Sequence, residues 1–79
     1  MFNKEIMINA VVALGFTYSG KADSTGVCYE GSGHVVNIFN EGMVHIKPNG
    51  QRKFYYSDAS PARIRAALVK SLAYYKNAQ

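Results

Sequence analysis

The sequence predicts a single α+β domain, residues 1–79, built as a helix, a three-stranded antiparallel meander and a second helix. Both ends of the chain repeat apolar residues with helical spacing, whereas the middle has short β-branched and aromatic runs separated by turn residues. The length suits one domain. Hydrophobic residues make up 48% of the chain, which is enough for an ordinary packed core.

The first helix is predicted over Lys4 to Leu14. Asn3 is a suitable N-cap, and Gly15 is suited to end the helix. The apolar residues recur at i, i+3, i+4 and i+7 spacing, which places them on one side: Ile6, Met7, Ala10, Val11 and Leu14.

The segment from Ser19 to Gly26 is rich in Ser, Gly, Asp and Thr, so we expect an exposed loop there, and the most mobile part of the chain. At most a short extra strand precedes it, over Phe16 to Tyr18. Strand-like runs follow, and they are divided by turn sequences at Gly31-Ser32-Gly33, Asn40-Glu41-Gly42 and Pro48-Asn49-Gly50. This pattern predicts a meander of adjacent hairpins.

The second helix is predicted to begin at Ser60-Pro61 and to end near Lys76. Serine is a favoured N-cap, and proline is favoured at the first helical position. The buried stripe of this helix is expected to be Ile64, Leu68, Leu72 and Tyr75.

The turn sequences also predict the register of the strands. An Asn-Gly pair is the strongest short hairpin signal, so a two-residue loop is expected at Asn49-Gly50. That loop pairs Lys47 with Arg52, His45 with Phe54, Val44 with Tyr55 and Met43 with Tyr56. A three-residue loop over Asn40–Gly42, with its glycine in the left-handed conformation, pairs Phe39 with Met43, Ile38 with Val44 and Val36 with Ile46.

This register gives the sheet two unlike faces. One face is apolar and is assigned to the core beneath both helices: Val36, Ile38, Val44, Ile46 and Tyr55. The other face mixes aromatic, apolar and cationic side chains: Val35, Asn37, Phe39, Met43, His45, Lys47, Arg52, Phe54 and Tyr56. Because two helices can cover only one face, we expect the second face to be open to solvent.

An open face of this composition is typical of an interaction surface. Aromatic rings among lysines and arginines suit the stacking of unpaired bases, with phosphates held at the rim. The same composition suits a protein interface, where aromatic residues, Met and Arg are enriched. In the alternative arrangements the helices straddle the sheet, or the chain forms a homodimer through this face.

Charge is unevenly distributed along the chain, whose formal net charge is +4. Residues 1–46 contain two basic and four acidic residues, whereas residues 47–79 contain seven basic residues and one acidic residue. This asymmetry favours nucleic acid or an anionic protein surface as the partner of the C-terminal half. A basic charge that serves solubility alone is the alternative.

The single cysteine, Cys28, cannot form an internal disulfide. Together with the lack of a charged-then-apolar leader, it favours a cytoplasmic protein. The longest nearly apolar stretch, Ile6 to Phe16, is too short to cross a bilayer, so no membrane partner is expected.

Candidate catalytic and metal-binding residues are few. Cys28, His34 and His45 lack the paired spacing of a structural zinc site, so no metal or other cofactor is predicted. The sequence has no acid pair at useful spacing, no GxSxG and no GxxxxGK. His34 is the one residue suited to acid–base chemistry toward a ribose hydroxyl. We favour the other interpretation, a polar residue at the edge of a strand.

Two local features resemble known families. The first predicted helix closes in Leu14-Gly15-Phe16, and Gly31-Ser32-Gly33-His34 opens a strand. With the order helix, three strands, helix, these residues resemble double-stranded-RNA-binding domains and the related HicA toxin ribonucleases. HicA toxins place the histidine directly after Gly-Ser, whereas Gly33 intervenes here. The resemblance implies an RNA-directed role, with His34 matching the catalytic histidine of the toxins.

Three functions follow, in this order of preference. The first is a nucleic-acid-binding module, and the second is a phage- or mobile-element-type protein that inhibits a larger machine. The third, a HicA-like ribonuclease that uses His34, is the only enzyme among them. The residues predicted to bind the partner are Phe39, Met43, His45, Lys47, Arg52, Lys53, Phe54, Tyr56, Arg63 and Arg65.

Overall fold

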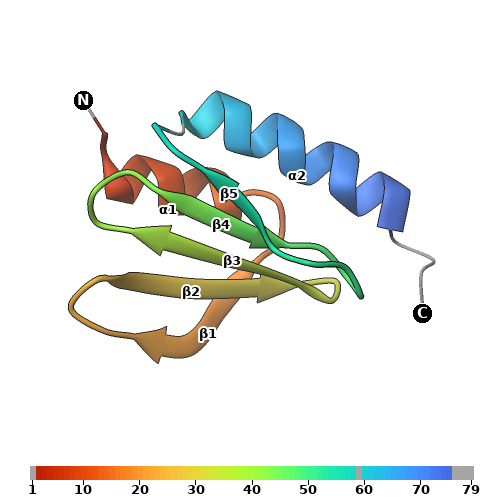
Figure 1. Cartoon of the computed structure of the whole chain (residues 1–79), viewed down its shortest axis with the longest axis horizontal. Helices are drawn as coiled ribbons and strands as arrows, with labels where there is room; N and C mark the ends of the chain where they lie inside the picture. The colour runs from red at the N-terminus through yellow and green to blue at the C-terminus, as the bar shows by residue number, and fades with distance from the viewer. Residues whose placement is uncertain (1, 59, 76–79) are drawn as a thin grey trace.

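The computed structural model describes residues 2–58 and 60–75. The elements are α1 (Lys4–Val12), β1 (Thr17–Ala22), β2 (Gly26–Gly31), β3 (His34–Phe39), β4 (Val44–Lys47), β5 (Phe54–Tyr56) and α2 (Pro61–Tyr75). The strands form one antiparallel sheet in the order β1-β2-β3-β4-β5 (Figure 1). The predicted α+β class is confirmed, but the meander has five strands, where three strands and at most one short extra strand were expected.

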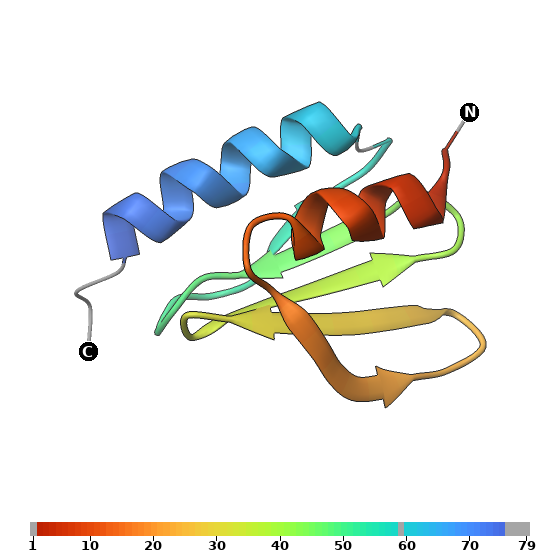
Figure 2. The same cartoon turned by 180° about the vertical axis from the view of Figure 1, so that it is seen from behind.

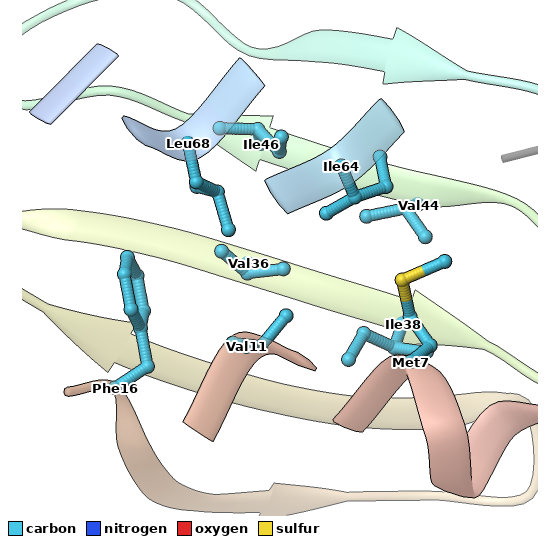
Figure 3. Close-up of a cluster of buried hydrophobic side chains, with 9 residues drawn as sticks. All are labelled: Met7, Val11, Phe16, Val36, Ile38, Val44, Ile46, Ile64 and Leu68. Atoms are coloured by element: carbon cyan, nitrogen blue, oxygen red, sulfur yellow. The ribbon is translucent and has the colours of Figure 1, made fainter. Parts of the chain in front are cut away.

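Both helices lie on the same face of the sheet, with α1 against β3 and α2 along β4 and β5 (Figures 1 and 2). Between the helices and the sheet lies the buried core: Met7, Val11, Phe16, Val36, Ile38, Val44, Ile46, Ile64 and Leu68 (Figure 3). Within the described ranges no helix lies on the opposite face. The structure therefore has the two unlike faces that the strand pattern predicted.

The helix boundaries follow from the capping residues. The Asn3 side chain accepts a hydrogen bond of 3.1 Å from the Ile6 amide, and α1 ends at Val12, two residues before the predicted end. The Ser60 hydroxyl accepts a bond of 3.1 Å from the Arg63 amide, which confirms it as the N-cap of α2. The described part of α2 ends at Tyr75, and the expected terminus at Lys76 lies outside the described residues.

The segment expected to be a loop is largely a strand. β1 continues to Ala22, with an irregular stretch after Tyr18 where Gly20 takes a φ of +88°. Only residues 23–25 form the turn to β2, and the Asp23 carboxylate organises it by accepting bonds from the amides of Thr25 and Gly26 at 2.8 and 3.1 Å. The Ser, Gly and Asp residues of this segment are typical of turns, so the sequence pattern did not predict the strand. An irregular strand with a glycine bulge accommodates such residues.

The turn between β1 and β2 is also tied to the rest of the fold through one residue. Asn40 donates from its backbone amide to the Thr25 carbonyl at 2.9 Å and from its side chain to the Ser24 carbonyl at 2.7 Å. Lys4 donates in turn to the Asn40 side-chain oxygen at 2.7 Å. These long-range bonds order a segment whose composition alone indicates mobility.

The register of the central strands is as predicted. Ile38 lies opposite Val44 and Val36 lies opposite Ile46. The three-residue loop before β4 ends in Gly42 with a φ of +104°, a conformation that favours glycine. The buried apolar face of β3 and β4 follows directly from this pairing.

The predicted register of β4 and β5 is wrong by one residue. Val44 lies opposite Tyr56 and His45 opposite Tyr55, so every side chain of β5 is on the other face from the one expected. Phe54, opposite Ile46, and Tyr56 therefore face the helices. Tyr55, which was assigned to the core, is 67% exposed on the open face.

Two features explain the shift. The connection runs from Pro48 to Lys53, and Asn49 keeps a negative φ, whereas a tight two-residue turn of the expected type needs positive φ at both central residues. The Asn49 side chain instead packs against Gly33 of the neighbouring hairpin. The contact is so close that a Cβ atom at position 33 would lie 2.7 Å from Cγ of Asn49. In the observed register two aromatic residues of β5, Phe54 and Tyr56, are on the face that carries the helices. The predicted register would have placed only Tyr55 on that face.

None of the helices in the described ranges combines the length and the apolar character that a bilayer span requires.

Candidate binding face

The open face of the sheet is the side that carries no helix in the described ranges. Its residues on the three C-terminal strands are Val35, Asn37, Phe39, His45, Lys47 and Tyr55. Three rings cross it in a row that we call the aromatic ladder: Phe39, His45 and Tyr55. The centroids of Phe39 and His45 are 4.7 Å apart, and those of His45 and Tyr55 are 4.4 Å apart. Tilted and edge-on ring pairs are favourable arrangements, so the three rings form one continuous aromatic surface.

Side chains beside the ladder set its chemical character. Met43 lies next to it, with its sulfur 3.0 Å from Nε2 of His45. A thioether can only accept, so Nε2 carries the proton and donates it. Lys47 follows two residues after His45 on the same strand face, and Lys53 precedes Tyr55 by two residues. The ladder is therefore flanked by two cationic side chains.

Burial beside its neighbours holds the pKa of His45 below its usual value of 6.5, and the positive charge of Lys53 lowers the pKa further. The histidine is therefore neutral at neutral pH. A neutral imidazole stacks as an apolar ring and leaves phosphate attraction to the lysines.

The lowered pKa of His45 makes stability depend on pH. Because the unfolded chain binds the proton more readily, stability is greatest above the ordinary pKa, decreases as the pH falls through about 6.5, and levels off below the folded pKa. We expect the Tm of the wild type to decrease between about pH 7.5 and about pH 5 more than that of His45→Gln. Lys53→Met should weaken this pH dependence only partly, because burial is the larger cause. Equal Tm shifts for wild type and His45→Gln would contradict the assignment.

Three of the predicted binding residues lie on the helix side instead. Phe54 and Tyr56 line a groove of about 590 Å³ between β4, β5 and α2. Arg63, from the first turn of α2, lies over the Tyr56 ring with its guanidinium carbon 5.3 Å from the centroid. These residues cannot share one flat surface with Phe39 and His45, because the sheet separates them.

The remaining predicted cations are also dispersed. Arg65 borders a second groove between α1 and α2, next to Ala10 and Ala66. Arg52 is exposed in the connection before β5. Of the ten residues predicted to bind the partner, the open face brings together Phe39, Met43, His45, Lys47 and Lys53.

His34 is fully buried, on the helix face of β3. Its Nδ1 lies 3.1 Å from the Ser32 carbonyl, which can only accept, so Nδ1 carries the proton. Its Nε2 therefore accepts from the Ser71 hydroxyl of α2 at 2.9 Å. With both nitrogens bonded and no exposed surface, the ring joins β3 to α2. This buried position differs from the polar edge of a strand that we favoured from the sequence, and it places the ring away from solvent.

A hollow of about 340 Å³ adjoins the aromatic ladder, where the irregular end of β1 meets β2 and β3. Asn37, Phe39 and Cys28 line it from β3 and β2, and Lys21 lines it from β1. Sequence reasoning placed Asn37 on the open face but did not select it, and it missed Tyr55 altogether. The alternation of β3 was a sufficient signal for Asn37, whereas Tyr55 required the true β5 register.

No group of three or more His, Cys, Asp and Glu side chains in the described ranges is placed to hold a metal ion. Comparisons with protein families, with curated proteins and with solved structures found no match for this chain.

Proposed function

We propose that this protein binds single-stranded nucleic acid on the open face. The observation that carries the proposal is the aromatic ladder with Tyr55 exposed at its end, where 67% of the side chain is accessible. Every base has a π-face, so exposed rings on a rigid sheet stack bases of any sequence. A duplex keeps its bases stacked inside, which favours unpaired strands as the ligand.

The charge next to the ladder suits a polyanion. Lys47 and Lys53 lie beside the rings. Glu30 of β2 lies in the same cross-strand row as Lys47, with Val35 of β3 between them. Each phosphate neutralised on a single strand is expected to steepen the decrease of log affinity with log salt by about 0.7. The open face therefore supplies stacking and modest phosphate attraction in one place.

The adjacent aromatics of β5 give a matched test of the proposal. Tyr55→Ala is expected to weaken binding of a labelled single-stranded oligonucleotide roughly 5- to 150-fold, the equivalent of losing one base–aromatic stack. Phe54→Ala, one residue away but facing α2, should leave affinity nearly unchanged. Fluorescence anisotropy at two salt concentrations measures both variants, and circular dichroism checks that each is folded.

Cationic variants test the second part of the proposal. Lys47→Ala with Lys53→Ala should reduce the salt dependence of binding by one to two phosphate contacts, or about 0.7 to 1.4 in the log–log slope. Arg65→Ala, a cation beside α1, is the control. If the wild type keeps its affinity in high salt, or if Arg65→Ala has the larger effect, nucleic acid is not held by the open face.

An inhibitor that binds a larger protein is the second candidate. Exposed apolar side chains beside the groove at α2 favour it, since Tyr74 is 78% exposed and Phe54 is 41% exposed. A partner complex that survives high salt and is lost in Phe54→Ala but not in Tyr55→Ala would select this function over the first.

A further inference from the structure

The groove beside α2 adjoins a free edge of the sheet. β5 is the last strand in the order β1-β2-β3-β4-β5, so only β4 pairs with it among the described residues (Figure 1). The groove, of about 590 Å³, is lined mainly by apolar and aromatic groups. Phe54 and Tyr56 line it from β5, and Tyr74 lines it from α2. It is therefore a surface on the helix side of the sheet, separate from the aromatic ladder.

The hydrogen-bond pattern of the sheet shows which backbone groups of β5 point outward. In the hairpin before β4, the Phe39 amide donates to the Met43 carbonyl at 2.9 Å, so these residues form a hydrogen-bonded pair. Such pairs alternate with non-hydrogen-bonded pairs along an antiparallel ladder, and a residue whose backbone bonds one neighbouring strand turns away from the other. His45 therefore bonds toward β3, and Tyr55, opposite His45, directs its N–H and C=O away from β4. These two groups are open to pairing with an added strand.

A strand added at this edge would place alternate side chains in the groove. Residues directly opposite each other in a sheet share a face, so the added residues opposite Phe54 and Tyr56 would lie on the helix side. The residue between them, opposite Tyr55, would point to the open face. Two backbone hydrogen bonds add little net affinity in water, so the two side chains in the groove must supply most of it.

Charge at the groove favours an acidic partner. Lys70 lines the groove, and Arg63 lies over the Tyr56 ring with its guanidinium carbon 5.3 Å from the centroid. Among the described residues, none of those that line the groove is acidic, and Asp58 is the only acidic residue after position 46 of the sequence. A second copy of this chain would bring the same cations to the contact, so charge disfavours self-association there.

We infer that the groove and the free edge of β5 receive an extended acidic segment of a partner protein. Two apolar or aromatic side chains of the segment, separated by one residue, fill the groove, and carboxylates beside them face Lys70 and Arg63. The inference does not rest on the nucleic-acid proposal, and it gives the second candidate function a partner of stated chemistry. Because the groove and the open face lie on opposite sides of the sheet, one can fail without the other.

Peptide display on the whole protein tests the inference. Random dodecapeptides on phage are first depleted on the Phe54→Ala variant and then selected on the wild type, which retains those that need the groove. The enriched sequences are expected to carry Asp or Glu beside two apolar residues separated by one. Enriched sequences that are basic or neutral, or the lack of any sequence that depends on Phe54, would overturn the inference.

Substitutions then locate the most enriched peptide, synthesised with a fluorescent label. Tyr74→Ala is expected to lower its affinity roughly 5- to 30-fold, since an exposed aromatic side chain of the groove is lost. Lys70→Glu should lower the affinity roughly 2- to 10-fold. Arg65→Glu makes the same charge change beside the groove between α1 and α2, and an effect as large as that of Lys70→Glu would contradict the inference. Tyr55→Ala should bind the peptide normally, so a loss of oligonucleotide binding alone leaves the inference intact.

Amide hydrogen exchange, measured by NMR, tests the extended conformation of the peptide. A saturating amount of the peptide should slow exchange of the Tyr55 amide, which gains a partner at the edge, and leave the Phe54 amide, directed toward β4, nearly unchanged. Unaltered exchange at Tyr55 would overturn the inference. So would a wild type that is dimeric and becomes monomeric in Phe54→Ala, because a second copy would then fill the groove.

Discussion

Replacing Leu68 with alanine is expected to lower the free energy of unfolding by about 2–5 kcal/mol. Leu68 is fully buried on the sheet side of α2, where Figure 3 shows its side chain extending toward Val36. The truncation removes apolar burial and leaves a cavity that rigid strands cannot fill. Since a domain of this size is stable by only about 5–15 kcal/mol, a large share of the stability would be lost.

The neighbouring residue provides the control for this substitution. Val69 is 50% exposed on the same helix, so Val69→Ala should change the free energy of unfolding by less than about 0.5 kcal/mol. Urea denaturation followed by circular dichroism measures both variants. Similar losses for the two would mean that α2 does not present Leu68 to the sheet.

Helices were the part of the fold that could be predicted best, because the signals that form them are local. The side chains of Asn3 and Ser60 each accept a bond from the amide three residues later in sequence, and the spacing of Ile64 and Leu68 alone identifies the buried side of α2. The central strands were also predictable, since Gly42 determines the loop between them.

Long-range contacts explain what the sequence could not show. The polar composition of residues 19–26 predicted a loop, but the structure has the end of β1 and a short turn there. The turn is held by hydrogen bonds from Asn40, which is far away in sequence, so local composition could not reveal it. Asn49 is held by contact with Gly33 of another hairpin, and this contact accompanies the shift in register of β5. Turn propensity is a local preference, and tertiary packing overrode it here.

The candidate site shows the same division. Phe39, His45 and Lys47 were placed correctly on the open face, because strand alternation and one glycine loop determine their side. An error of a single residue in the next hairpin exchanged Tyr55 for Phe54 and Tyr56. The aromatic and basic character of the face survived that exchange, because β5 has aromatic residues at all three positions.

His34→Ala is expected to lower the free energy of unfolding by about 2–4 kcal/mol, since it leaves the Ser32 carbonyl and the Ser71 hydroxyl without this partner and opens a cavity. The ring is fully buried and both its nitrogens are bonded. Such a loss of stability separates a structural histidine from a catalytic one, because removal of an acid–base group from an open site would leave folding nearly intact. Thermal and urea denaturation of the variant measure the loss.

Ser71→Ala tests the bond that joins β3 to α2. It removes the hydroxyl donor 2.9 Å from Nε2 of His34, and a cost of about 1–3 kcal/mol is expected because the buried nitrogen is then unsatisfied. In a double-mutant cycle with His34→Ala, the two losses should fall short of additivity by about 0.5–3 kcal/mol, because both substitutions remove the same bond. Additive losses would show that the pair contributes no coupling. An unchanged stability of His34→Ala would instead restore the histidine as a candidate for chemistry in the ribonuclease alternative.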